Sequence, residues 1–151
     1  MRIATGTLLL LACSLIAGCA TAPATPQTPI ALPVSFSDVW YRPTLGRPGL
    51  QVMTDTGTVV VGTKGVAFSG TTGSVDIDYA TMREVSFGNV GSDLINSWVT
   101  IRYQQGNAES YALFSGGKAL GWGSFGVASK IFQAIDSALH ERGMSSIVKR
   151  T

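Results

Sequence analysis

Reactive sulfur and imidazole groups are scarce in this chain. Its 151 residues include two cysteines, Cys13 and Cys19, and one histidine, His140. A single histidine excludes a metal site built on a pair of imidazoles, and it leaves His140 as the one conventional base for a hydrolase. The nucleophile motif Gly-x-Ser-x-Gly and the Walker A phosphate loop are also missing. The sequence therefore predicts a protein that is not an enzyme, with no catalytic residues and no bound metal.

Charge is scarce as well, since charged residues make up 13% of the chain and the net charge is +2. Neither sign is gathered into a long run, which argues against the basic stripe of a nucleic-acid-binding protein. Hydrophobic residues reach 45% and glycines number 18, a composition unlike that of a disordered tail or a helical bundle. The length and composition indicate one β-rich domain.

No hydrophobic run is long enough to cross a bilayer as a helix. The apolar residues 8–17 number about ten, whereas a spanning helix needs roughly 20. Arg2 precedes this run, and the small residues Ala17 and Gly18 end it, which is the pattern of a secretory signal peptide. We therefore expect residues 1–18 to be a signal peptide.

Ile16-Ala17-Gly18-Cys19 resembles the lipobox of bacterial lipoproteins. The resemblance implies that Cys19 becomes the mature N-terminus and carries a covalent diacylglycerol and an N-acyl chain such as palmitate, with no other cofactor. Two or three acyl chains, at about 0.8 kcal/mol per buried methylene, anchor a protein to its membrane lastingly. Because Ala20 and not aspartate follows, the resemblance implies the periplasmic face of the outer membrane in a Gram-negative cell. The alternative is an ordinary signal peptide with a chance cysteine.

Residues 19–33 form a proline-rich linker in this interpretation. Pro23, Pro26, Pro29 and Pro33 recur at nearly three-residue spacing, which is typical of polyproline II helix. At about 3.1 Å per residue the linker would hold the domain up to roughly 40 Å from the lipid. A ligand for an SH3-type domain is the alternative use of such a segment.

Strand patterns separated by turn signals follow the linker. Several of them alternate apolar and polar residues with period two, as in Val75, Ile77 and Tyr79. The expected strands are residues 50–54, 58–61, 66–69, 74–79, 83–87, 98–103 and 110–114, with 35–41 as a first strand or an irregular lead-in. Turn signals occupy residues 63–65, 70–73 and 105–107.

The apolar period then changes to that of a helix. Val127, Ile131, Ile135 and Leu139 share one face of an amphipathic helix of about four turns. Ser124 or Ser129 is a candidate N-terminal cap, and Gly143 lies where a left-handed residue would end the helix, with Met144 closing back onto the last turn.

Short antiparallel strands followed by one C-terminal helix resemble the pleckstrin-homology-like architecture and its bacterial and GRAM-type relatives, over about residues 50–143. The hairpin of residues 57–68 and the two strands after it carry the resemblance. It implies a mainly β fold in which a strongly bent antiparallel sheet, or a partly open barrel, is capped by the helix. We expect residues 34–143 to form this domain and residues 144–151 to be a tail.

Two acidic features invite chemical hypotheses. Asp55-Thr56-Gly57 matches the aspartic-protease triplet, which would require a dimer to supply the second carboxylate, and a hairpin turn explains the same letters. Asp76 and Asp78 share one face of a predicted strand and are candidates for a hard-cation site. The alternative is that Asp76 and Asp78 are ordinary polar residues on the solvent-exposed face of that strand.

The loop of residues 115–126 is the strongest candidate for a binding function. It places Lys118, Trp122 and Phe125 among five glycines between the last strand and the helix, where a partner can receive large apolar groups. The alternative is that both aromatics cap the core.

Taken together, these features predict a membrane-anchored periplasmic lipoprotein. Its domain is predicted to be a non-catalytic binding or adaptor module for another envelope component, and the expected partner is a protein. A carrier of a small hydrophobic or lipid ligand is the alternative, and it predicts an apolar cavity between sheet and helix. A dimeric hydrolase that uses Asp55 is the more remote alternative.

Overall fold

The computed structural model describes residues 30–46, 53–117 and 126–150. The expected signal peptide, Cys19 and most of the linker lie outside the described residues, as do Lys118, Trp122 and Phe125. Among the residues that are described, no helix is both long enough and apolar enough to cross a membrane.

The described chain forms one antiparallel sheet, apart from one parallel pair, and a single α-helix. The strand order across the sheet is β4-β3-β2-β1-β7-β6-β5-β8, so that β4 and β8 are the edges and the sheet is not closed. The strands are β1 (Val34–Arg42), β2 (Asp55–Val61), β3 (Gly65–Gly70), β4 (Ser74–Asp78), β5 (Met82–Val90), β6 (Asp93–Gln105), β7 (Ala108–Gly116) and β8 (Val148–Lys149). The helix α1 spans Val127–Glu141, and short 3-10 helices cover Tyr79–Thr81 (η1) and Ser145–Ile147 (η2).

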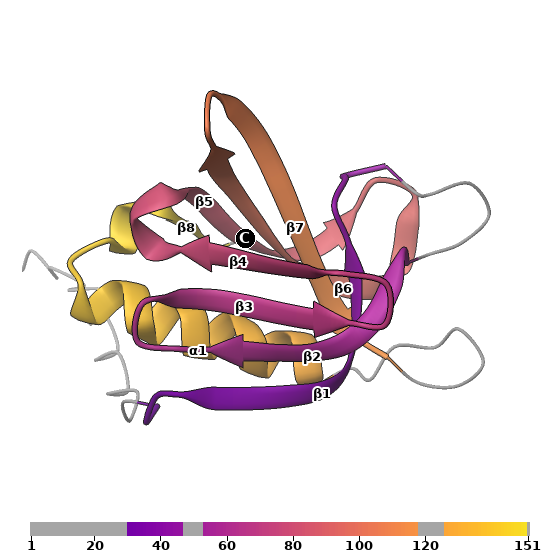
Figure 1. Ribbon diagram of the computed structural model, residues 1–151, viewed down its shortest axis with the longest axis horizontal. Coiled ribbons are helices and arrows are strands. Elements are labelled where there is room, and N and C mark those ends of the chain that lie inside the picture. The colour runs from indigo at the N-terminus through magenta and orange to yellow at the C-terminus, as the bar shows by residue number, and fades with distance from the viewer. Residues whose placement is uncertain (1–29, 47–52, 118–125, 151) are drawn as a thin grey trace, which may run out of the picture.

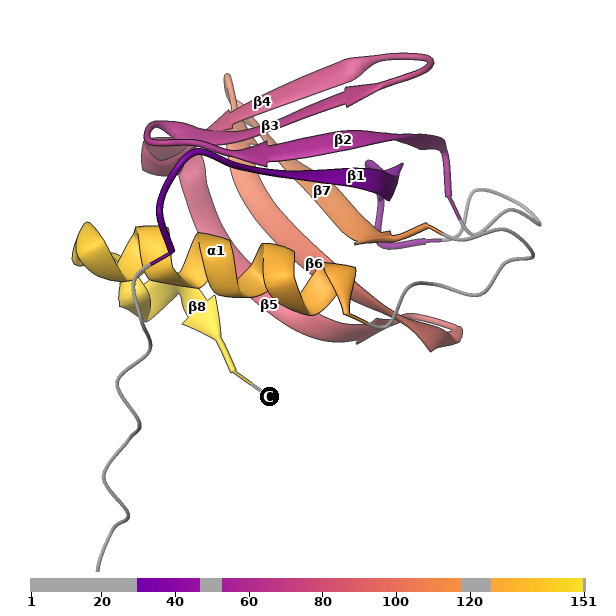
Figure 2. The same ribbon diagram turned by 90° about the horizontal axis from the view of Figure 1, so that it is seen from below.

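The sheet is strongly bent, and α1 lies in the opening of the bend. Strands β1 to β4 form one half, and β5 to β7 curve away from it (Figures 1 and 2). In Figure 2, β5 and β6 pass behind α1. Strand β7 joins the halves because it pairs with both β1 and β6. The expected fold class, a mainly β chain with a bent sheet capped by one C-terminal helix, is confirmed.

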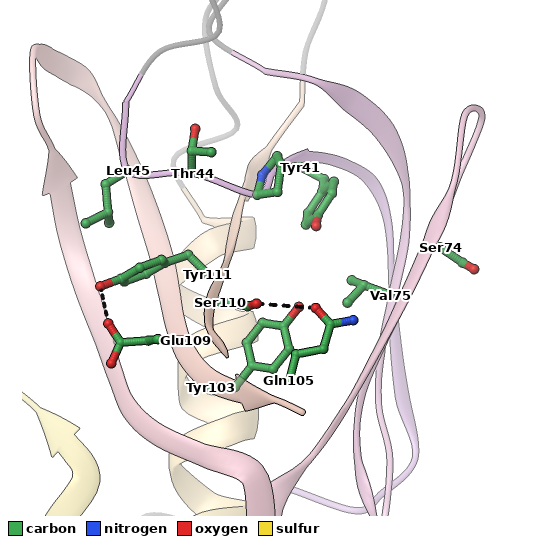
Figure 3. A pocket seen from close by; sticks show the side chains of 11 residues that line it. Tyr41, Thr44, Leu45, Ser74, Val75, Tyr103, Gln105, Glu109, Ser110 and Tyr111 are labelled. Atoms are coloured by element: carbon green, nitrogen blue, oxygen red, sulfur yellow. Dashed lines mark hydrogen bonds between the residues drawn. The ribbon is translucent and has the colours of Figure 1, made fainter. Parts of the chain in front are cut away.

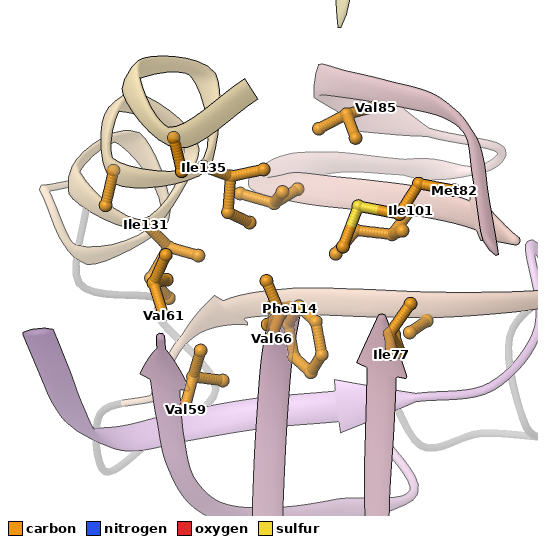
Figure 4. Close-up of a cluster of buried hydrophobic side chains, with 14 of the residues drawn as sticks. Val59, Val61, Val66, Ile77, Met82, Val85, Ile101, Phe114, Ile131 and Ile135 are labelled. Carbon is orange, nitrogen blue, oxygen red and sulfur yellow. The ribbon is translucent and has the colours of Figure 1, made fainter. Parts of the chain in front are cut away.

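Apolar side chains fill the space between α1 and the sheet (Figure 4). The helix contributes Ile131, Ile135 and Leu139, all fully buried, as the 3.6-residue period predicts. The strands contribute alternate residues such as Val59 and Val61. The other members of this core include Val66, Phe68, Ile77, Met82, Val85, Val99, Ile101, Ala112 and Phe114. Close packing of this kind is the main source of stability in a small domain.

Asp55, Thr56 and Gly57 lie in β2, so the predicted hairpin turn at this triplet is wrong. Gly57 is flanked on both sides, by Val39 of β1 and Gly70 of β3. A Cβ atom at this position would overlap the carbonyl oxygen of Ser69. Glycine is therefore required here by the close approach of a neighbouring strand, a requirement that looks like a turn signal in the sequence.

The start of this region also differs from expectation. Thr54 forms a bend and Met53 is irregular, so the end of the predicted strand 50–54 is not a strand, and residues 50–52 lie outside the described residues. The remaining predicted strands are present and mostly longer, because backbone pairing continues past the apolar core positions.

The two ends of α1 differ in how well the sequence predicted them. Gly126 precedes the helix and no side chain caps it, so the predicted cap at Ser129 is wrong: Ser129 is the third helical residue. Ser124 lies outside the described residues. Gly143 has a φ of 69°, and the Met144 amide donates to the Leu139 carbonyl at 2.8 Å, as predicted.

Residues 144–150, expected as a tail, continue the fold. Val148 and Lys149 pair in parallel with Val85 and Ser86 of β5. Arg150 then forms an ion pair with Asp136 of α1 at 2.8 Å. A two-residue strand carries too little periodicity to be recognised in a sequence.

Candidate binding site

A pocket of about 560 Å³ opens where the end of β1, the start of β4 and the hairpin of β6 and β7 come together (Figure 3). This volume is within the range of small-ligand sites. Tyrosines and uncharged polar groups dominate its lining, and Glu109 is the one charged residue in it. The lining comprises Tyr41, Pro43, Thr44, Leu45, Ser74, Val75, Tyr103, Gln105, Glu109, Ser110 and Tyr111.

Aromatic stacking holds the inner wall of the pocket. The ring of Tyr41 stacks on Phe68, with centroids 4.7 Å apart, and lies 5.7 Å from the ring of Phe114. Tyr103 is only 5% exposed and faces inward from β6, opposite Ser110 of β7. The Ser110 hydroxyl donates to Oε1 of Gln105 at 3.3 Å. Stacking therefore holds the Tyr41 ring, and burial encloses the Tyr103 ring, without the use of either hydroxyl group.

The hydroxyls of Tyr41 and Tyr103 have no hydrogen-bond partner among the residues that the structure describes. They are not sealed in the core either, since neither is a buried unsatisfied atom. Burial raises the pKa of Tyr103, and burial, followed by the proximity of Tyr103 and Asp55, raises the pKa of Tyr41. Both groups are therefore protonated at neutral pH and offer a donor and an acceptor to a ligand.

The carboxylate of Glu109 is already engaged. Tyr111 donates its hydroxyl to Glu109 Oε1 at 2.8 Å, and Arg102 pairs with Oε2 at 2.9 Å. The Tyr111 bond first, and then Arg102, lower the pKa of Glu109. Arg102 also pairs with Glu84 at 3.2 Å. Glu109 is thus ionised and held in place rather than poised to exchange a proton.

Asp55 ties the β3–β4 turn to the start of β2. Its carboxylate accepts hydrogen bonds from the amides of Thr56, Thr71 and Thr72 and from the Thr71 hydroxyl, at 2.6 to 3.1 Å. The Thr71 side chain is the leading cause that holds the pKa of Asp55 well below its usual range. A catalytic aspartate of a protease pair needs the opposite, a carboxyl that shares a proton. Asp55 instead positions the turn that leads into Ser74 and Val75 of the pocket.

An apolar tip lies beyond the pocket, at the start of β6 next to the turn from β5. Leu94 and Ile95 are 79% and 55% exposed. The fully buried Asp93 shapes this turn, because its carboxylate accepts bonds from the Ile95 amide and from the amide and side chain of Asn96. The carbonyl of Leu45, a pocket residue that is 44% exposed, lies beside Gly91 of the same turn. The tip and the pocket are therefore neighbours.

Asp76 and Asp78 lie on the exposed face of β4, as one of the two hypotheses predicted. Asp78 accepts a bond from the Ala80 amide at 2.8 Å and so caps η1. Within residues 30–46, 53–117 and 126–150, no three His, Cys, Asp or Glu side chains gather as metal ligands.

Sequence reasoning did not identify the tyrosine pocket. Periodicity placed Tyr103 on an inward face, but an inward face is either core or cavity, and the difference depends on what lies opposite. Tyr41 falls in residues 35–41, which are predicted as a first strand or an irregular lead-in, and no local pattern places it beside Tyr103. The usable signal was the presence of tyrosines, whose polar ends need a partner, at the ends of apolar stripes.

No protein-family model matches this chain, and no curated protein matches it either.

Proposed function

We propose that this protein is a lipid-anchored lipoprotein of the bacterial outer membrane that acts, on the periplasmic side, as a non-catalytic binding module for another envelope protein. The observation that carries the proposal is the pair of hydroxyls of Tyr41 and Tyr103, which lie on a stacked ring and a buried ring in an open pocket and have no partner among the described residues. Polar groups that a fold orients but does not satisfy are characteristic of binding sites. The resemblance of the strand and helix order to pleckstrin-homology-like domains agrees with a binding module but does not identify its ligand.

The direction in which the chain enters the domain supports this proposal. The linker would join β1 at Val34, whereas Tyr41 lies at the other end of the same strand. Nine residues of strand span roughly 25 Å. A domain tethered at Val34 can therefore present its pocket and its apolar tip away from the anchored lipid.

The alternative of a carrier receives less support. A carrier needs an apolar cavity between sheet and helix, and that space contains fully buried side chains such as Ile131, Ile135 and Phe114. The pocket lies instead at the rim of the sheet and mixes hydroxyls, an amide and a carboxylate with apolar groups. Such a lining suits a segment of protein better than an acyl chain.

Site-specific photo-crosslinking in intact cells tests the binding function. The photoreactive residue p-benzoylphenylalanine replaces Leu45 at the pocket and, as a control, Glu141 at the far end of α1. A discrete protein adduct formed from position 45 and not from position 141 supports the proposal. A phospholipid adduct at position 45 overturns it in favour of a carrier, and the absence of any adduct overturns the pocket as the contact surface.

The anchor has a separate test. Metabolic labelling with palmitate should mark the wild-type chain and leave Cys19→Ala unlabelled, and the variant should move from the membrane fraction to the soluble fraction. A Cys13→Ala variant is the matched control, because this cysteine lies in the segment that the signal peptidase would remove. Unlabelled wild-type protein would contradict the lipoprotein assignment.

A further inference from the structure

Strand β4 ends the sheet with one free backbone edge. Among the described residues it pairs with β3 alone, and the register shows which of its backbone groups are left without a partner there. The Gly70 amide donates to Gly73, and the Tyr79 amide donates to Lys64. In an antiparallel ladder, hydrogen-bonded pairs alternate along the strand. Val75 and Ile77 therefore bond to β3, whereas the intervening residues of β4 point their backbone groups outward.

The outward groups belong to Ser74, Asp76 and Asp78. The carbonyl of Asp78 accepts the Thr81 hydroxyl at 2.8 Å, which leaves its amide for a partner. The amides and carbonyls of Ser74 and Asp76 have no partner among the described residues. The free edge thus presents three donors and two acceptors in a row, in the geometry that pairs with an extended chain.

The free edge leads directly into the tyrosine pocket. Ser74 and Val75 belong to both, and the nearly buried Tyr103 lines the pocket with a hydroxyl that no described residue satisfies. In a sheet, side chains on one face of adjacent strands lie next to each other. An extended chain added to β4 would therefore direct alternate side chains toward Val75 and the tyrosines.

The opposite face of the same edge is acidic. Asp76 and Asp78 are exposed, neither forms an ion pair with another described residue, and β4 contains no Lys or Arg. Their neighbours across the ladder on β3 are Ala67 and Gly65, which are uncharged. An added chain with basic residues at alternate positions would place them next to these carboxylates.

We propose that the free edge of β4 is a docking site for an extended, basic segment of a partner protein, which adds a strand to the sheet and inserts alternate side chains into the tyrosine pocket. This inference rests on the proposed binding function and specifies its partner class. The backbone of the partner pairs with Ser74, Asp76 and Asp78, its Lys or Arg residues face the aspartates, and the intervening residues face Val75 and Tyr103.

The test uses the full chain in detergent micelles and a defined probe, a blocked heptapeptide of alternating lysine and valine. Amide hydrogen exchange, resolved by residue with NMR, should slow at Ser74, Asp76 and Asp78 when the probe binds. A peptide with glutamate in place of lysine tests the charge. A peptide N-methylated at every residue keeps the side chains but has no backbone donor. Both control peptides should leave the three amides unprotected.

Two substitutions at one position separate charge from backbone pairing. Asp76→Asn keeps the outward amide and should weaken binding of the probe about 2- to 5-fold, the range for one surface charge pair. Asp76→Pro removes the amide as well, at an edge position where no ladder bond is lost, and should weaken binding by about a further 2- to 10-fold. Near-UV circular dichroism of both variants checks that the fold is retained.

The outcomes distinguish this inference from the proposed function. Binding of the N-methylated peptide as tightly as the probe, or no protection of the three amides by the probe, overturns docking at the free edge. A partner adduct from position 45 that persists in Asp76→Pro cells would likewise overturn it, while the adaptor proposal stands. The loss of that adduct in Asp76→Pro and its retention in Asp76→Asn would support pairing with β4.

Discussion

The indole Nε1 of Trp98 donates a hydrogen bond to Oδ2 of Asp93 at 2.8 Å. Both side chains are fully buried, although Asp93 sits at the first position of β6 beside the exposed Leu94. The guanidinium of Arg42, also fully buried, lies 4.3 Å from the centre of the Trp98 ring. A charged cluster on the side of the sheet away from α1 thus supports the turn that carries the apolar tip.

This hydrogen bond should contribute measurably to stability. Trp98→Phe keeps an aromatic ring beneath Arg42 but loses the donor, and it should lower the free energy of unfolding by about 1 to 3 kcal/mol, because the buried Asp93 loses one partner. Urea unfolding of Trp98→Phe, Asp93→Asn and the double variant gives the coupling between them, which should lie at about 0.5 kcal/mol or more. Additive effects would contradict a direct bond.

Acid should destabilise the protein through Asp55 and Asp93. In the folded state, hydrogen bonds hold the pKa of both carboxyls below the usual range, despite the opposing effect of burial. A lowered folded pKa means that the stabilisation is present above the unfolded pKa of about 4 and is lost as the pH falls below it. Urea midpoints measured from pH 6 down to pH 2 should therefore decline. The decline should be shallower in Asp55→Asn and in Thr71→Val, which removes one donor to Asp55; equal slopes would contradict this account.

Two glycines should respond very differently to the same substitution. Gly57→Ala places a Cβ against the Ser69 carbonyl and should destabilise by about 1 to 3 kcal/mol, the usual range for overpacking. Gly73→Ala meets nothing within 4 Å and should change stability by less than about 0.5 kcal/mol. Thermal unfolding of the two variants compares them directly. A tolerated Gly57→Ala would show that β2 and β3 are further apart than described.

Removal of one tyrosine hydroxyl should separate binding from stability. Tyr103→Phe should leave the free energy of unfolding within about 0.5 kcal/mol, because no described residue bonds to this hydroxyl, and it should reduce the cross-linking yield from position 45. Tyr79→Phe is the matched control. Its hydroxyl donates to the Gly62 carbonyl at 3.0 Å, so the variant should lose about 1 kcal/mol of stability and keep its cross-links. The reverse pattern would place the functional hydroxyl elsewhere.

The apolar tip should also be dispensable for folding. Leu94→Gln combined with Ile95→Gln should shift stability by less than about 0.5 kcal/mol, whereas Leu113→Ala, in the buried cluster with Trp40 and Trp98, should lower it by about 2 to 5 kcal/mol. Chemical unfolding measures both. If the partner covers the tip as well as the pocket, the double variant should reduce cross-linking from position 45. A large loss of stability in the double variant would mean that the tip is part of the core.

Local features of the sequence were sufficient to predict most secondary structure. A strand places alternate residues on one face whatever lies next to it, so the period of two predicts that Val75 and Ile77 face inward, and Tyr79 is also buried although it begins η1. The same holds for the apolar face of α1 and for the left-handed Gly143. The proposed lipid anchor at Cys19 and the linker also rest on local sequence and stay predictions.

Long-range contacts were beyond the reach of local patterns. The amides of Thr71 and Thr72 donate hydrogen bonds to Asp55, which lies 16 and 17 positions away in the chain. These bonds give Asp55 a structural role, although its triplet resembles that of a catalytic aspartate. The predicted Ser129 cap is wrong because Ser129 is the third residue of the helix, inside its first turn, and Gly126 precedes the helix instead.

The periodicity of neighbouring residues is enough to predict a mainly β chain with one C-terminal helix and the inward and outward faces of its strands, and the bent sheet capped by the helix is what the family resemblance implies. The meeting of Tyr41, Val75 and Tyr103 in one pocket depends on the three-dimensional packing, and so does the placing of β4 at one edge of the sheet and of β8 at the other. These features depend on the bend of the sheet and on strand order. Both are set by packing between segments far apart in the chain, which no local pattern records.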